Sequence, residues 1–314
     1  MSPEQQSISI ALGQHLKHIG LHEIFYNENV TNILLNSDGN LWIEEFGREP
    51  YIHSQIKASD SEILIRYVAS FHKVTLTEFQ PIVEGLFPLL EARFAGTIPP
   101  ITKQTSFAIR KRATRVFTLN DYLDSDTITK GQYDYINKAV YDRKNIFIAG
   151  GTGSGKTTLT NAVIDTIVKA TPFHRLLIIE DTNEIQCSAD NHETLTTSEH
   201  ASYNQLLRLT LRYYPTRIIV GEVRGGEALQ LLKLWNTGHP GGISTIHADS
   251  AELALDRLEQ CIQEVLPTVN KKIIAEGVDV ILFVAKTSSG RKVTEIIEVT
   301  GLDSNNNYII NYVK

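Results

Sequence analysis

The sequence has little cysteine and no long apolar run. Its 314 residues include only Cys187 and Cys261, too few for a disulfide framework and not in the C-x-x-C spacing of a zinc module. A reducing compartment, the cytoplasm, is therefore expected. The best candidate for a membrane span, 278–285, is far shorter than the roughly 18 apolar residues required, and it contains Asp279.

The chain also lacks an excess of positive charge. Thirty lysine and arginine residues stand against 36 aspartate and glutamate residues, which gives a net charge of −6. General nucleic-acid binders usually carry a strongly basic domain, so nucleic acid is not expected as a main ligand. The basic stretch 111–115 keeps one alternative open, a motor that translocates DNA. The 42% of apolar residues is typical of globular chains, and the length favours about two domains.

The first 112 residues are predicted to form an α+β domain. Short apolar strands are expected at 31–35 and 41–45 around a turn, with a helix at 59–71 and a strand at 107–110. We expect 113–126 to be a linker.

From residue 127 to 314 the pattern changes to strands that alternate with helices. The expected strands are 145–149, 175–180, 217–222, 242–247 and 278–285, and the expected helices are 156–169, 204–212, 226–235 and 251–265. Strands that are apolar on both faces and separated by helices predict an α/β domain with a mostly parallel sheet. The segments 292–299 and 308–313 are expected to close it as an antiparallel pair.

The clearest motif is a phosphate-binding loop that fits G-x-x-x-x-G-K-[ST]. It follows an apolar strand and opens a helix, and it consists of Gly150, Gly151, Thr152, Gly153, Ser154, Gly155, Lys156 and Thr157, with Thr158 behind it. Glycines let backbone N–H groups face a phosphate, and the helix N-terminus adds partial positive charge. Lys156 is expected to reach the β- and γ-phosphates of ATP, and Thr157 to bind Mg²⁺.

Polar residues end the neighbouring strands. Glu180 and Asp181 follow one apolar strand and are candidates to hold Mg²⁺ through water, against the alternative of a solvated strand end. Glu222 ends the next strand, in an atypical Gly-Glu form, and is placed to polarise an attacking water. His247 follows a glycine-rich segment, 238–242, and is a candidate sensor of the γ-phosphate, against the alternative of a core histidine.

In this order the four segments resemble the Walker A, Asp box, Walker B and His box of the secretion traffic ATPases, motors of type II and type IV secretion and of type IV pili. The segments are GGTGSGKTT, IIEDTNE, RIIVGEVRGGEAL and GGISTIHADSAELALDRLE. The TrbB-type conjugal transfer branch is the most similar. Only two cysteines are present, which speaks against the type II branch with its four-cysteine module, and the late helical motif of pilus retraction motors is not found.

The resemblance implies a PAS-like N-terminal domain and a RecA-like C-terminal ATPase domain, with ATP between them, in a homohexameric ring. By position, Arg93 and Arg110 match arginines that reach the phosphates in that family. Glu222 matches the catalytic glutamate, His247 the His-box histidine and Glu180 a position near the metal. The implied partners are proteins of an inner-membrane secretion or conjugation apparatus. Peripheral attachment of this chain to the cytoplasmic face of the membrane is compatible with that role. A small-molecule kinase or a nucleotide switch remains the alternative from another class.

Overall fold

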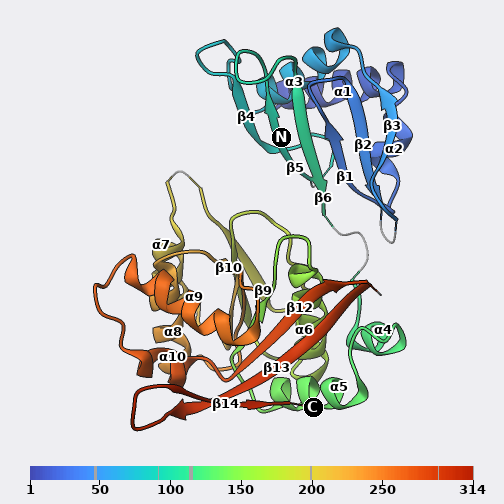
Figure 1. The fold of residues 1–314 in the computed structure, drawn as a ribbon. Coiled ribbons are helices and arrows are strands. Elements are labelled where there is room, and N and C mark those ends of the chain that lie inside the picture. Colours follow the sequence, from blue (N-terminus) through green and yellow to red (C-terminus); the bar gives the residue numbers. More distant parts are fainter. Residues whose placement is uncertain (46–47, 91, 113–115, 199, 289, 314) are drawn as a thin grey trace. The chain divides into compact units, whose positions relative to one another are not determined.

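The computed structural model describes residues 1–45, 48–90, 92–112, 116–198, 200–288 and 290–313. The chain divides into two compact units, Met1–Thr114 and Arg115–Lys314 (Figure 1). One hydrophobic cluster fills the first unit, and two fill the second. In the part of the chain described, no helix is both long and apolar enough to cross a bilayer.

The first unit is an antiparallel sheet with helices packed on it. Its elements are α1 (Pro3–His18), α2 (His22–Tyr26), β1 (Val30–Leu35), β2 (Asn40–Glu45), β3 (Tyr51–Gln55), α3 (Ala58–Phe71), β4 (Ile82–Leu86), β5 (Ala92–Thr97) and β6 (Ser106–Lys111). The strand order is β3-β2-β1-β6-β5-β4, and every pair is antiparallel. Alternate strand residues such as Ile33, Ile43 and Ile109 are fully buried in one cluster with Leu16 and Leu64 of the helices. The predicted strands and the 59–71 helix are confirmed.

The second unit is an eight-stranded sheet with helices on both faces. Its helices are α4 (Leu119–Asp124), α5 (Lys130–Tyr141), α6 (Lys156–Ala170), α7 (Tyr203–Thr210), α8 (Glu227–Asn236), α9 (Ala251–Gln263) and α10 (Lys271–Gly277). Its strands are β7 (Ile146–Ala149), β8 (Leu176–Glu180), β9 (His192–Thr196), β10 (Arg217–Val223), β11 (Ile243–Ile246), β12 (Val280–Thr287), β13 (Gly290–Leu302) and β14 (Tyr308–Tyr312). Residues of α4, α5 and α6 share one core cluster with the sheet, and residues of α7 to α10 share the other.

Strand order places the predicted motifs together. The order is β14-β13-β12-β7-β11-β10-β8-β9. The six neighbouring strands from β12 to β9 in this order run parallel to one another, and β13 pairs antiparallel with both β12 and β14. Parallel strands end at one edge of a sheet. The phosphate-binding loop after β7, Glu180 at the end of β8, Glu222 in β10 and His247 after β11 therefore share that edge.

The structure differs from the prediction in the segment 113–126. Residues 113–115, including the end of the basic stretch, lie outside the described residues. Thr118 caps helix α4 through a capping box with Asp121, and Leu119 and Tyr122 are buried in the core of the second unit. Residues 119–124 of the expected linker thus form a packed helix, because Leu119 and Tyr122 have the helical spacing that buries them on α5 and α6.

Candidate nucleotide-binding site

The phosphate-binding loop joins β7 to α6 through glycines whose backbone needs them. Gly153 and Gly155 have φ of +70° and +103°, which side chains with a Cβ rarely adopt, and a Cβ on Gly150 would collide with the carbonyl of Val284. Nζ of Lys156 donates to the carbonyl oxygens of Gly150 and Gly151, at 2.9 and 3.0 Å. The lysine is buried, so its charge is held inside the loop at the start of α6.

One buried donor in this loop is left for a ligand. In the part of the chain described, the hydroxyl of Ser154 is buried and has no hydrogen-bond partner. Buried polar groups are nearly always paired in native proteins. An orphaned hydroxyl beside a buried ammonium, at the N-terminus of a helix of 15 residues, fits a phosphate group.

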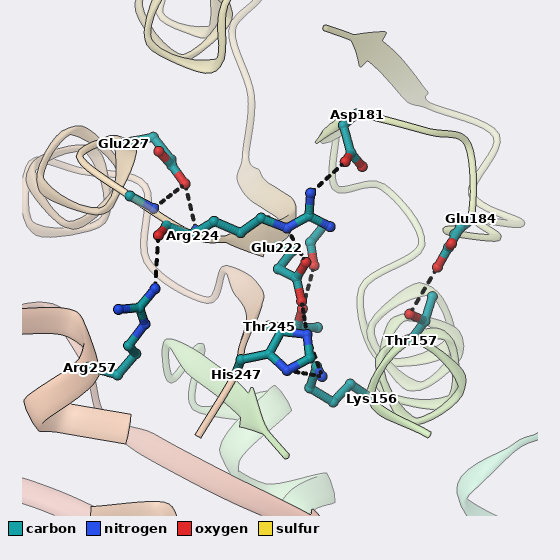
Figure 2. A network of polar contacts seen from close by, with 12 residues as sticks. Lys156, Thr157, Asp181, Glu184, Glu222, Arg224, Glu227, Thr245, His247 and Arg257 are labelled. Atoms are coloured by element: carbon teal, nitrogen blue, oxygen red, sulfur yellow. Dashed lines mark hydrogen bonds and ion pairs between the residues drawn. The ribbon is translucent and has the colours of Figure 1, made fainter. Parts of the chain in front are cut away.

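Lys156, His247 and Glu222 form a connected set across three strand ends, as Figure 2 shows. Nζ of Lys156 lies 3.4 Å from Nε2 of His247, and that nitrogen lies 3.1 Å from Oε1 of Glu222. Partial burial and the charge of Lys156 lower the pKa of His247, while Glu222 opposes them. The imidazole is therefore neutral at pH 7, and it links the phosphate loop to the predicted catalytic carboxylate.

Arg224, which was not among the predicted site residues, contacts the other oxygen of Glu222. Its Nε donates to Oε2 of Glu222, and its guanidinium also reaches Oδ2 of Asp181 at 3.0 Å (Figure 2). Oε1 of Glu227 accepts from the backbone N–H of Arg224 at 2.6 Å, which fixes the turn after β10. In the sequence, the only sign of this contact is that Arg224 stands two residues after Glu222.

The hydroxyl of Thr157 lies beside Glu184, which was not among the residues predicted near the metal. The hydroxyl of Thr157 donates to Oε2 of Glu184 at 3.2 Å. Glu180 is 2% exposed, and its Oε2 accepts from the backbone N–H groups of Glu184 and Ile185, at 2.9 and 3.0 Å. Glu180 thus holds the loop after β8, and this loop brings Glu184 to Thr157.

The oxygen atoms of Thr157 and Glu184 are suitable ligands for Mg²⁺. Hydroxyl and carboxylate oxygens are the ligands that this hard cation prefers, usually with one or two carboxylates and the phosphates of the substrate. Among the residues that the structure describes, no three His, Cys, Asp or Glu side chains are grouped to hold a metal by themselves. A magnesium ion at Thr157 and Glu184 would therefore depend on phosphate oxygens.

The two predicted arginines belong to the first unit and lie next to each other there. Arg93 in β5 is directly opposite Arg110 in β6, and Arg110 is also opposite Asn32 in β1. Arg93 is half-buried, and Arg110 is exposed. The two arginines thus share one register position of adjacent strands, where opposed Cβ atoms lie about 5 Å apart.

Comparisons with known proteins match both units. The family described as "Type II/IV secretion system protein" matches residues 16–295. The chain is 45% identical over 276 residues to the conjugal transfer protein TrbB of Rhizobium radiobacter, covering 88% of this chain and 85% of that protein. It is 32% identical to the type IV secretion system protein PtlH of Bordetella pertussis, covering 96% of this chain and 98% of that protein. The solved structure of the Legionella pneumophila ATPase DotB shares the fold, with a TM-score of 0.61 and 18% identity, covering 90% of this chain and 79% of that one.

Proposed function

Since the chain belongs to the Type II/IV secretion system protein family, we propose that it is the ATPase of a type IV secretion or conjugal transfer system. One observation carries the proposal. Lys156, Glu222 and His247, three residues from separate motifs, are joined in one set of contacts at the carboxyl edge of a parallel sheet. That edge is where α/β proteins bind nucleotides.

Phosphoryl transfer requires that the reacting groups are positioned and that charge on the phosphates is stabilised. We assign a separate part of this task to each residue of the site. Lys156 would move from the carbonyls of its own loop to the β- and γ-phosphates of ATP, with the Ser154 hydroxyl as a further donor. Glu222 would orient the attacking water, and the neutral His247 would sense the γ-phosphate through Lys156. Release of Glu222 from either Arg224 or His247 would free an oxygen for that water.

The metal site follows from the contacts of Thr157. Mg²⁺, held by Thr157 and Glu184, would neutralise charge on the phosphates. Glu180 would act by fixing the loop that carries Glu184, so the role near the metal that its sequence position implied becomes indirect.

The larger assembly is proposed from the family. We infer a PAS-like first domain and a RecA-like second domain in a homohexameric ring on the cytoplasmic side of an inner-membrane apparatus. Arg93 and Arg110, side by side on β5 and β6, would supply cations to the phosphates. Loss of the γ-phosphate would release these contacts and let the domains move, which would power pilus assembly or substrate transfer.

Phosphate release from a panel of Mg-nucleotides, with no acceptor present, tests the function. We expect release from ATP, little change on adding single-stranded DNA, and hexamers with ATP in analytical ultracentrifugation. Hydrolysis that depends on an added small-molecule acceptor would instead indicate a kinase. Strong stimulation by DNA that falls with salt would indicate a nucleic-acid translocase, and monomers alone at micromolar concentration would contradict the ring.

A further inference from the structure

The hairpin of β12 and β13 lies against the phosphate-binding loop. Strand β12 pairs in parallel with β7, Phe283 opposite Ala149, so β12 continues past the point where β7 ends and the loop begins. The carbonyl of Val284 backs directly onto Gly150. Strand β13 returns from the hairpin with Arg291 opposite Lys286. The start of β13 is thereby placed beside the loop.

Arg291 reaches from this hairpin onto the loop. Its Nε donates to the carbonyl of Gly153 at 3.1 Å. A Cβ built on Gly155 would lie 3.0 Å from Cδ of Arg291 and 3.6 Å from its Nε. The side chain therefore lies along the loop, in space that Gly155 leaves open.

The rest of the guanidinium has no competing partner. Across the described ranges, the Gly153 carbonyl is the only hydrogen-bond acceptor of Arg291, and no carboxylate pairs with it. Arginine carries five N–H donors in a planar fork that suits phosphate. The bond through Nε fixes the fork at the loop and leaves the two terminal nitrogens to bind an anion.

We propose that Arg291 is a further nucleotide-binding residue, which binds the phosphate chain from the open side of the loop. The inference rests on the proposed function and adds to it a cation from the same unit as Lys156, separate from Arg93 and Arg110. Lys156 is buried within the loop and Arg291 is exposed beside it, so the two would contact the phosphates from different sides. Its contribution is to affinity, since it touches neither Glu222 nor His247.

The test compares Arg291→Ala and Arg291→Lys with Lys292→Ala. Lys292 is the next residue of the strand, and its Nζ donates to the carbonyl of Asp126. Neighbouring strand residues point to opposite faces, so this control removes a cation that does not face the loop. Equilibrium binding of fluorescent ATP and ADP is measured with Mg²⁺, together with competition by inorganic tripolyphosphate.

We expect Arg291→Ala to weaken ATP, ADP and tripolyphosphate by a similar factor, about tenfold, as for one charge-assisted hydrogen bond. KM for ATP should rise with kcat nearly unchanged, Arg291→Lys should recover part of the affinity, and Lys292→Ala should match the wild type. Wild-type binding by Arg291→Ala overturns the inference. A loss for nucleotides but not for tripolyphosphate also overturns it, because the contact would then be to the base or ribose.

Lys156→Ala in the same assay separates the two claims. If Lys156→Ala loses nucleotide while Arg291→Ala binds normally, only the role of Arg291 fails. If Lys156→Ala itself binds nucleotide normally, the proposed site fails.

Discussion

Strand β10 begins at Arg217 and carries Glu222 near its other end, and these two charged residues are held in different ways. Arg217 is completely buried, and it donates to Nδ1 of His174 and to the carbonyls of Gly241 and Val140, at 3.1, 3.0 and 3.1 Å. Burial lowers its pKa to about 10, so it remains charged at pH 7.

Among the described residues, the carboxylate of Glu222 contacts the side chains of His247 and Arg224. Both partners are charged or can titrate. The carbonyls that Arg217 contacts belong to the end of α5 and to the segment before β11, which the fold holds in place, whereas side-chain partners can be exchanged when a ligand arrives. The amino edge of the sheet thus uses charge to join β10 to α5 and to the segment before β11, and the carboxyl edge keeps charge available for chemistry.

The glycines show the same difference. Gly241 has φ of +83°, and a Cβ there would collide with the guanidinium of Arg217. A Cβ on Gly242 would collide with the Trp235 ring, whereas one on Gly151 of the phosphate loop would meet nothing within 4 Å. Gly241 and Gly242 therefore serve packing at the amino edge, whereas Gly151 and Gly153 of the phosphate loop leave space beside the backbone.

At the carboxyl edge, we expect Lys156→Ala to have the largest effect. Removing the buried ammonium leaves the phosphates without their central cation, so ATP turnover should be abolished. Steady-state phosphate release measures it. Lys169→Ala is the control, since Lys169 lies on the same helix and forms an exposed ion pair with Asp165. Substantial turnover by pure Lys156→Ala would remove this loop from the mechanism.

Glu222→Gln should keep nucleotide binding and slow hydrolysis by at least about a hundredfold, the typical loss on removing a general base. The amide keeps the shape of the side chain, so the unfolding free energy should change little. Nucleotide affinity and single-turnover hydrolysis are measured on the same sample. Unchanged hydrolysis would move the catalytic role to another carboxylate, with Glu180 and Glu184 the next to substitute.

Arg217→Met tests the amino edge. The substitution leaves the carbonyls of Gly241 and Val140 buried without this donor, which should lower the unfolding free energy by about 1–3 kcal/mol. Chemical denaturation measures the loss. Turnover per folded molecule should stay within about twofold, because Arg217 is at the opposite end of the strand from Glu222. A hundredfold loss of turnover in a folded sample would contradict the division between the edges.

The smallest effect is a pH dependence at His174. Burial, then the charges of Arg217 and Arg143, lower the pKa of His174 in the folded chain, and its Nδ1 accepts from Arg217. The unfolded chain therefore binds the proton more readily, and stability should be lost as the pH falls through about 6.5 and below. His174→Gln keeps an acceptor but does not titrate.

His247 has a lowered pKa too, so the comparison of wild type with His174→Gln isolates the contribution of His174. Denaturation curves at several pH values measure it. The same pH dependence in both proteins would show that His174 does not contribute.

Much of the fold could be predicted because buried strands are apolar on both faces. The runs that became β7, β8, β10, β11 and β12 are nearly continuous in apolar or β-branched residues. Strands β3, β4, β5 and β9 were not predicted. Three of them are edge strands, and β9 reads HETLT, without an apolar pattern. Strand β5 lies inside its sheet, but its sequence ARFAGT contains an arginine and a glycine that interrupt the apolar pattern.

The site could be predicted where strand order alone positions a residue, as for Glu222 and His247. It could not be predicted where a loop decides which side chain faces inward. The segment after β8 offers Glu180, Asp181 and Glu184, and the contact between Glu184 and Thr157 depends on the loop conformation that Glu180 holds through two backbone N–H groups. Arg224 and Arg291 were not predicted either, since the contacts of Arg224 with Asp181 and of Arg291 with Gly153 join segments that are distant in the sequence.

The most direct measurement takes kcat and the unfolding free energy from the same preparations of Glu222→Gln and Arg217→Met. We expect Glu222→Gln to lose turnover at nearly wild-type stability, and Arg217→Met to lose stability at nearly wild-type turnover per folded molecule. If each variant lost both properties in proportion, the two ends of β10 would not have separate roles, and the assignment of chemistry to the carboxyl edge would be contradicted.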